Sequence, residues 1–210
     1  MTQTQPAAIL TFRDEVAALK RQRILDAAAD LFYSHGYSNT TLDAVGEQLG
    51  FSKAFVYTNY GSKQQLLAEI CTHGVTGVHE EVRHALDLGL ETRPTLTVLM
   101  DRYVNAVLEH QKYIAVYVRE EKSLLPEDAV RVSGLRRAFF ATIADFIAKG
   151  TAEGVFQTTD PHMAALTLGG AVTWTTFWYR DTGRLDRKTI AREITRNANR
   201  MLGVSPGGGA

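Results

Sequence analysis

Apolar residues recur every three or four positions along most of the chain, which is the spacing of one face of an α-helix. The first such face comprises Ile24, Ala27, Ala28, Leu31 and Phe32. It predicts a helix over residues 20–35, which Gly36 ends as a C-terminal cap. Two short helices over residues 42–49 and 53–60 and a long helix from 63 to about 86 are expected to follow.

The rest of the chain repeats this helical spacing. Apolar faces predict helices over residues 96–108 and 113–121, and a proline opens a further helix over 126–150. An Asp-Pro pair opens the helix over 160–180, and Asp186 caps the last helix. No segment shows the alternating pattern of a β-strand. The sequence therefore predicts an all-α fold of about nine helices and no sheet.

Composition narrows the class of protein. The 210 residues carry 23 basic and 23 acidic side chains, so any positive surface for nucleic acid must be local. One cysteine, Cys71, excludes a disulfide framework and favours a buried, inert thiol in a reducing compartment. No stretch reaches the roughly 18 apolar residues of a membrane span, and no secretory leader is expected at the N-terminus. These features predict a cytoplasmic protein without a membrane partner.

Residues 37–63 contain the spacing of a helix-turn-helix. Thr41 is a suitable N-cap for the first short helix, and Gly50 breaks that helix. Ser52 caps the second short helix, which Gly61 ends. Such a pair places its second helix in the major groove of DNA, although a hairpin inside any helical bundle has the same spacing. The outward positions of the second helix favour DNA, because Lys53, Ala54, Tyr57 and Thr58 are small or form hydrogen bonds.

The segment over residues 20–70 resembles the DNA-binding domain of TetR-family transcriptional regulators. The resemblance is carried by ILDAAADLFYSHGY, TTLDAV, the glycine turn and YTNYGSKQQLL, with Gly46 and Tyr60 where the family usually has Ala and Phe. It implies phosphate contacts from Thr41, Tyr57 and Lys63, and a base-facing side for the second helix. The complete set of expected DNA-binding residues is Thr41, Ser52, Lys53, Ala54, Phe55, Tyr57, Thr58, Tyr60 and Lys63.

The resemblance also implies a domain order. We expect a flexible N-terminal arm over residues 1–19, a DNA-binding domain over 20–71, a ligand-binding and dimerisation domain over 72–203, and a flexible tail over 204–210. Lys53 and Lys63 are balanced by Asp43 and Glu47, so further positive charge has to come from helix N-termini and from basic residues near the arm. Those residues are Arg13, Lys20, Arg21 and Arg23. The arm either reaches an adjacent groove or is a solvated tail.

The stretch over residues 168–185 draws attention in the C-terminal half. Gly169 and Gly170 fall inside a predicted helix, where another backbone is expected to approach closely. Trp174, Phe177 and Trp178 then share one face, which either packs in the core or lines a ligand cavity that is shared with the dimer interface. The run WTTFWYRDTG is similar to the TetR subgroup that senses acyl-CoA thioesters. The expected ligand-binding residues are Tyr113, Tyr117, Arg119, Trp174, Phe177, Trp178 and Arg180, with Arg119 or Arg180 at the negative end of the ligand.

These observations predict a ligand-responsive repressor that binds a palindromic double-stranded operator as a homodimer and releases it on binding a hydrophobic effector. The expected effector is an acyl-CoA thioester, and a neutral aromatic or drug-like compound is the alternative. No cofactor, metal or enzymatic activity is expected: the two histidines of HEEVRH, residues 79–84, lie five positions apart and cannot share one face. The competing class is an α-helical binding protein or enzyme that does not bind DNA.

Overall fold

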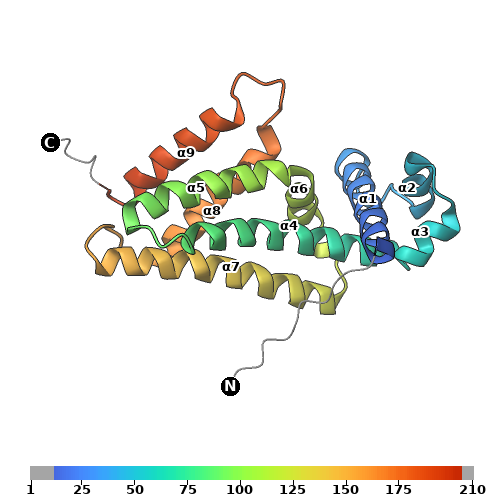
Figure 1. Ribbon diagram of the computed structural model, residues 1–210, viewed down its shortest axis with the longest axis horizontal. Helices are drawn as coiled ribbons and strands as arrows, with labels where there is room; N and C mark the ends of the chain where they lie inside the picture. Colours follow the sequence, from blue (N-terminus) through green and yellow to red (C-terminus); the bar gives the residue numbers. More distant parts are fainter. Residues whose placement is uncertain (1–11, 205–210) are drawn as a thin grey trace. The chain divides into compact units, whose positions relative to one another are not determined.

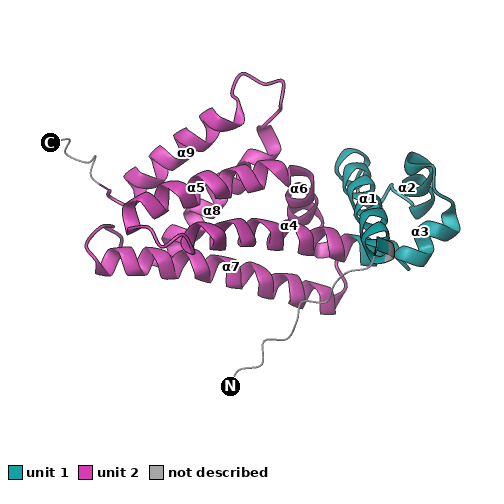
Figure 2. Cartoon of the chain, in the orientation of Figure 1, with its two compact units in different colours: residues 1–66 teal, residues 67–210 magenta. Residues whose placement is uncertain are grey.

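A computed structural model describes residues 12–204, and within this range the chain forms nine α-helices, one short 3₁₀ turn and no strand (Figure 1). The all-α prediction is confirmed. The chain divides into two compact units, Met1–Leu66 and Leu67–Ala210 (Figure 2). The boundary lies inside one helix, α4, rather than after Cys71 as expected. The arm up to residue 11 and the tail from residue 205 lie outside the described residues.

The N-terminal unit contains α1 (Phe12–His35), α2 (Leu42–Leu49), α3 (Lys53–Asn59) and the first residues of α4 (Lys63–Leu86). Helix α2 packs against both α1 and α3, and together the three helices bury the apolar faces that the helical spacing predicted. Fully or nearly buried side chains in this unit include Ile24, Ala28, Phe32, Leu42, Val45, Val56 and Leu66. The Phe32 and Tyr37 rings meet edge to face at 5.1 Å, which anchors the segment after α1.

Helix α1 begins at Phe12, so residues 12–19 are helical and the expected arm is wrong over that stretch. Phe12 and Leu19 are largely exposed, and the extension therefore buries no apolar face. Strong helix formers from Ala17 onward and the acidic pair Asp14 and Glu15 at the N-terminal end account for the helix instead. Sequence periodicity detects buried faces, and for that reason it did not detect these two turns.

The C-terminal unit contains the rest of α4, α5 (Thr92–Glu109), α6 (Gln111–Glu120), the 3₁₀ turn η1 (Glu121–Ser123), α7 (Pro126–Ala152), α8 (Pro161–Trp178) and α9 (Arg187–Met201). Helix α7 packs along α8, and α5 packs along α9, while α5 and α6 also contact α8. The buried cluster between these helices includes Leu99, Tyr103, Phe139, Ile143 and Leu168.

A glycine lets a side chain from α7 approach the backbone of α8. A Cβ added at Gly169 would lie 2.3 Å from Cε1 of Phe140, which is far inside van der Waals contact. The expected close approach therefore exists, but the partner is the Phe140 ring and not another backbone. A Cβ at the neighbouring Gly170 would meet nothing within 4 Å. Only the first glycine of the pair is required by packing.

Local capping residues confirm most of the predicted helix ends. The side chains of Thr41, Ser52, Asp160 and Asp186 each accept a hydrogen bond from a backbone N–H in the first turn of the following helix. Pro126 and Pro161 lie in first turns, where no backbone donor is lost. Several bounds differ by a few residues from the expected ones: α3 ends at Asn59 with Tyr60 as its C-cap, α8 ends at Trp178, and α5 begins at Thr92.

Candidate DNA-binding and effector sites

The turn between α2 and α3 has the geometry of a helix-turn-helix. Gly50 ends α2 with φ +66°, a left-handed conformation that glycine adopts without steric cost. The Phe51 N–H donates to the Gly46 carbonyl at 2.9 Å and closes the turn. A Cβ at Gly46 would lie only 3.0 Å from the Phe51 carbonyl oxygen. A side chain at position 46 would crowd the Phe51 carbonyl, so glycine allows the turn to pack closely against α2.

Most of the expected DNA-binding residues form one exposed group on α3 and at the start of α2. Thr41, Ser52, Lys53, Ala54, Tyr57 and Thr58 are all exposed. Phe55 is half-buried because its ring packs edge to face on Phe51 at 4.8 Å. Val56, on the opposite side of α3, is completely buried. Helix α3 is thus fixed by one apolar face and presents a polar one.

Lys63 and Tyr60 do not belong to that exposed group. The Lys63 ammonium donates to the carbonyls of Tyr37 at 2.9 Å, Ser38 at 3.4 Å and Thr40 at 3.0 Å, and it lies 4.4 Å from the centre of the Tyr37 ring. Tyr60 is 4% exposed. An ammonium has three N–H donors, so all of them are already used inside the unit. Both side chains are engaged inside the N-terminal unit, and the DNA contacts expected for them stay predictions.

Arg21 also has an internal role that the sequence did not reveal. Its guanidinium donates to the Asn59 carbonyl at 2.6 Å, at the C-terminal end of α3, and lies 4.5 Å from the centre of the Tyr60 ring. The Tyr60 hydroxyl in turn donates to the Arg21 carbonyl at 3.4 Å. A cation at a helix C-terminus is electrostatically favourable. Arg21 therefore links α1 to the end of α3, although it was expected to supply positive charge for DNA.

The positive charge of α3 is paired with an acidic side chain of α2. Lys53 Nζ lies 2.7 Å from Asp43 Oδ2, and this hydrogen bond raises the pKa of Lys53. Both side chains remain well exposed, and exposed ion pairs are weak. Lys53 can therefore exchange Asp43 for a phosphate or a base edge. The charge balance read from the sequence is confirmed at this pair.

The C-terminal unit contains a cavity of about 300 Å³ between α4, α5, α6, α7 and α8. Most of its wall is apolar. The lining residues are Val75, Val78, Tyr103, Val107, Ile114, Tyr117, Val118, Glu121, Arg136, Phe139, Phe140, Leu166, Gly169, Gly170 and Thr173. Small-molecule sites typically combine such a wall with a few polar groups.

Three polar residues of this cavity, Tyr117, Arg136 and Glu121, lie close to one another. The Tyr117 hydroxyl is buried and has no hydrogen-bond partner in the described part of the chain. Burial raises the pKa of Tyr117 to about 12, while the nearby Arg136 guanidinium opposes that shift. Arg136 Nη1 lies 3.3 Å from the Glu121 carboxylate. A charged pair and an unpaired hydroxyl thus mark one end of an otherwise apolar space.

Only Tyr117 among the seven expected ligand-binding residues lines this cavity. Trp174 and Trp178 are 64% and 45% exposed and do not line this cavity, although Trp178 lines a separate hollow together with Tyr179 and Arg180. Tyr113 is buried against the His73 ring, at 4.9 Å between ring centres. Phe177 lies beside Trp174 at 5.1 Å, and Arg119 lies 5.7 Å from the Phe177 ring centre.

The arginine at the cavity is Arg136, which the sequence reasoning missed. Arg136 lies three and four positions before Phe139 and Phe140, which also line the cavity. Residues at this spacing share a helix face. Helical spacing from those two aromatic residues was therefore the signal that could have singled out Arg136.

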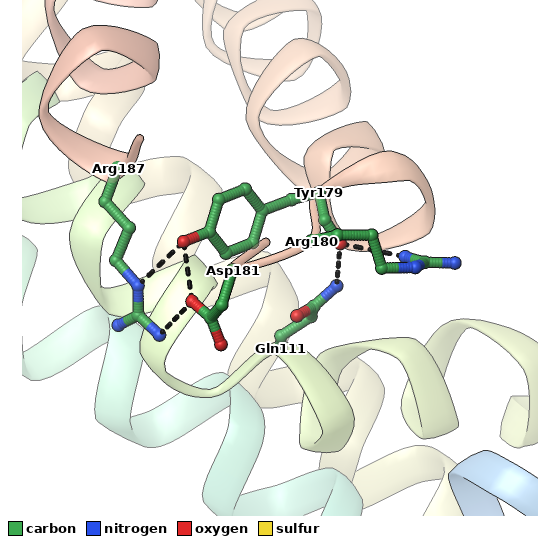
Figure 3. A network of polar contacts seen from close by, with 5 residues as sticks. All are labelled: Gln111, Tyr179, Arg180, Asp181 and Arg187. Atoms are coloured by element: carbon green, nitrogen blue, oxygen red, sulfur yellow. Dashed lines mark hydrogen bonds and ion pairs between the residues drawn. The ribbon is translucent and has the colours of Figure 1, made fainter. Parts of the chain in front are cut away.

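Arg180, the other expected contact to a negative ligand, belongs to a polar network at the end of α8 (Figure 3). Arg180 donates to the Tyr179 carbonyl at 2.8 Å, and Gln111 Nε2 donates to the same carbonyl at 3.1 Å. The Tyr179 hydroxyl lies 2.7 Å from Asp181 and 3.3 Å from Arg187 Nε. These contacts tie the α8–α9 connection to α6 and leave Arg180 away from the cavity.

Other candidate chemistry gives no site. Cys71 is completely buried, and burial raises the pKa of its thiol to about 12. Within residues 12–204, no group of three or more His, Cys, Asp or Glu side chains could hold a metal ion. None of the helices in the same range combines the length and apolar character that crossing a bilayer requires.

An exposed second helix in the helix-turn-helix of one unit and an apolar cavity in the other are the features of a helix-turn-helix regulator with a separate C-terminal domain. Family models agree with both units. Residues 24–70 match "Bacterial regulatory proteins, tetR family", and residues 90–202 match "Tetracyclin repressor-like, C-terminal domain". The chain belongs to the TetR family of transcriptional regulators.

Individual relatives support this assignment. The chain is 25% identical over 176 residues to the HTH-type transcriptional repressor KstR2 of Rhodococcus jostii, covering 83% of this chain and 86% of the relative. A TetR-family regulator from Rhodococcus RHA1 has a TM-score of 0.82 at 26% identity, with 89% and 98% of the two chains covered. AibR in complex with isovaleryl coenzyme A and operator DNA shares the fold, with a TM-score of 0.75 at 22% identity over 84% of this chain and 96% of that one.

Proposed function

We propose that this regulator is a repressor that binds a palindromic operator as a homodimer and leaves it when a hydrophobic effector occupies the cavity of the C-terminal unit. The observation that carries the proposal is the apolar cavity with one polar end, in a chain that also presents an exposed recognition helix. The similarity to a named repressor supports the direction of control. Helix α4 belongs to both units and lines the cavity through Val75 and Val78, so it is the element through which the effector would act.

DNA contacts are assigned to the exposed residues of α2 and α3. Thr41, Ser52 and Tyr57 are proposed to contact phosphates, and the backbone N–H groups at the start of α3 add a favourable dipole. Lys53, Ala54 and Thr58 are proposed to face bases, with Phe55 at the edge of that surface. Tyr60 and Lys63 are left out because their side chains are engaged inside the N-terminal unit.

The dimer surface is assigned to the outer face of α8. Met163, Leu166, Gly170, Trp174 and Trp178 form one exposed stripe along this helix, and Leu166 and Gly170 of this stripe also line the cavity of the C-terminal unit. Met201 on α9 adds another exposed apolar side chain. Large exposed apolar patches mark interaction surfaces, and a two-fold dimer would cover the same stripe on both copies. This assignment keeps the interface role that was expected for the two tryptophans and leaves out their ligand role.

The effector is proposed to be an acyl-CoA thioester whose acyl group enters the cavity. The solved AibR complex contains isovaleryl coenzyme A together with operator DNA, and AibR has the same fold. A neutral aromatic compound is the second candidate, because the wall contains Tyr103, Phe139 and Phe140. To change the DNA-competent fraction from 99:1 to 1:99, the effector must prefer the released form about 10⁴-fold.

The test is operator binding by fluorescence anisotropy, using the DNA upstream of the protein's own gene with and without a panel of acyl-CoA thioesters. We expect binding to a palindrome and release by at least one thioester. Saturable DNA binding that no thioester weakens, with release by uncharged aromatics, would favour the second candidate. Absence of any sequence-specific DNA binding would refute the regulator proposal and favour an α-helical binding protein or enzyme.

A further inference from the structure

We infer that the effector presents a carbonyl oxygen to the Tyr117 hydroxyl, and that Glu121 competes with the effector for the Arg136 guanidinium when that carbonyl belongs to a carboxylate. The inference rests on the proposal that the cavity is the effector site, and it deepens that proposal by naming the group that is recognised. The ligand class is an apolar chain of modest length that ends in a carboxylate or in a thioester.

The first observation is the unpaired Tyr117 hydroxyl. The side chain is only 6% exposed and lines the cavity, and its hydroxyl makes no hydrogen bond of ordinary geometry among the described residues. The Arg136 guanidinium lies near enough to act on the hydroxyl oxygen, but a guanidinium can only donate, so the phenol O–H has no acceptor. Buried hydroxyls are normally paired, because an unmade hydrogen bond is costly. A phenol at neutral pH donates one hydrogen bond. The group that satisfies this hydroxyl from within the cavity is therefore an acceptor, and a carbonyl oxygen is the simplest one.

The second observation is that Arg136 has more N–H donors than its ion pair with Glu121 uses. Its Nη1 lies 3.3 Å from each of the two Glu121 carboxylate oxygens. Charge-assisted hydrogen bonds usually measure about 2.7–2.9 Å, so this pair is loose. A guanidinium has five N–H donors, and the pair with Glu121 uses only one nitrogen. Arg136 can therefore donate to a second acceptor, and its ion pair with Glu121 keeps the guanidinium in place when no such acceptor is bound.

The third observation is the size and openness of the site. The cavity volume of about 300 Å³ is at the lower end of the range for small-molecule sites, which is roughly 300–1,000 Å³. Arg136 and Glu121 are 42% and 37% exposed, so the polar end is also the end that solvent reaches. An acyl chain fits inside, whereas the nucleotide part of a coenzyme A thioester would have to lie outside, past this polar end.

The two sources of the carbonyl make different demands on Glu121. A free carboxylate needs the positive charge of Arg136 and must displace the Glu121 carboxylate, which has the same charge. A thioester carbonyl is neutral, accepts from the Tyr117 hydroxyl, and leaves the Arg136–Glu121 pair in place. Replacing Glu121 by glutamine therefore strengthens the binding of a carboxylate and leaves the binding of a thioester nearly unchanged.

The experiment measures the affinity of the full-length protein for octanoate, octanoyl-CoA and naphthalene by calorimetry. Naphthalene is apolar and has no acceptor, so it reports on the cavity alone. Tyr117→Phe should weaken the carbonyl ligand about three- to tenfold and leave naphthalene binding unchanged. The unliganded variant should unfold at the same temperature as the wild type or higher, because an unpaired buried hydroxyl has been removed.

Charge variants identify the source of the carbonyl. If the ligand is a carboxylate, Glu121→Gln strengthens octanoate binding about tenfold and Arg136→Gln weakens it. If the ligand is a thioester, only octanoyl-CoA binds tightly and Glu121→Gln changes its affinity less than twofold. Glu81→Gln is the matched control, because Glu81 forms a comparable ion pair with Arg102 and does not line the cavity.

The inference is overturned if Tyr117→Phe binds both carbonyl ligands as tightly as the wild type while naphthalene still binds. In that case the cavity remains an effector site and only the recognised group is wrong. If none of the three compounds binds the wild-type protein while operator binding is intact, the cavity is not the effector site, and the proposed function and this inference fail together.

Discussion

Replacement of Lys63 distinguishes an internal clamp from a DNA contact. In the wild type, the Lys63 ammonium joins the first turn of α4 to the carbonyls of Tyr37, Ser38 and Thr40, directly before Thr41. Lys63→Met keeps the length and apolar part of the side chain and removes the three donors. We expect the segment over residues 37–41 and the helix-turn-helix that follows it to open more easily.

The magnitude follows from the three distances. The contacts at 2.9 and 3.0 Å are ordinary hydrogen bonds, and the one at 3.4 Å is weak. Hydrogen bonds from a charged donor contribute about 1.5–3 kcal/mol each when well protected. Because Lys63 is half-exposed, solvent screening reduces the total to about 2 kcal/mol. This corresponds to an opening equilibrium about 30-fold larger.

Hydrogen exchange by mass spectrometry measures this opening directly in peptides that cover residues 37–60. Operator binding at several salt concentrations supplies the second measurement. Lys63→Met should lower the affinity while the slope of log affinity against log salt stays the same, because no phosphate contact is lost. Lys53→Met is the matched control: Lys53 is exposed, so exchange should not change, while the proposed contact with DNA is removed.

One outcome would refute the internal role of Lys63. If exchange in residues 37–60 equals that of the wild type and the salt dependence becomes less steep by about 0.9, the ammonium contacts a phosphate in the complex. Its hydrogen bonds to the three carbonyls would then form only in the unbound protein, and the side chain would move to a phosphate in the complex.

Three further changes test other parts of the structure. Gly169→Ala should reduce the free energy of unfolding by about 1–3 kcal/mol through the clash with Phe140, as measured by urea denaturation, and Phe140→Leu should restore part of it; an unchanged midpoint would contradict the packing argument. Trp174→Glu should halve the mass seen by sedimentation if the exposed face of α8 is the dimer surface, and a dimer that persists would place the interface elsewhere. Burial and the nearby Arg83 lower the pKa of His79 below its ordinary 6.5, so the unfolded chain takes up the proton first and stability is lost as the pH falls below about 6.5; His79→Gln should flatten this part of the profile in thermal unfolding at pH 5 to 8.

The helices could be predicted because each one is specified by nearby residues. Caps such as Thr41 and Asp186 and the first-turn proline of α7 act within one turn of the helix they start. The glycine turn after α2 is equally local. Residues 12–19 were missed because they form a helix without burying a face, and the periodic pattern carries no information about such a segment.

The cavity could not be predicted in the same way, because its wall is assembled from five helices. Gly169, Gly170 and Thr173 of α8 line it, whereas Trp174, the residue after Thr173, does not and is exposed. The sequence marked an aromatic-rich helix, but its periodicity does not show which of these aromatic residues face the cavity. Similarly, nothing local shows whether a lysine such as Lys63 donates to phosphate or to backbone carbonyls.

Because Cys71 is buried, the rate at which its thiol is labelled reports how often the surrounding part of α4 opens. It is the single cysteine of the chain, it is fully buried in α4, and the raised pKa keeps its sulfur protonated at neutral pH. A thiol reagent can therefore modify it only during moments when that part of α4 is open. The labelling rate of the unaltered protein consequently counts those moments, and it can be followed with and without a bound compound, with no engineered probe.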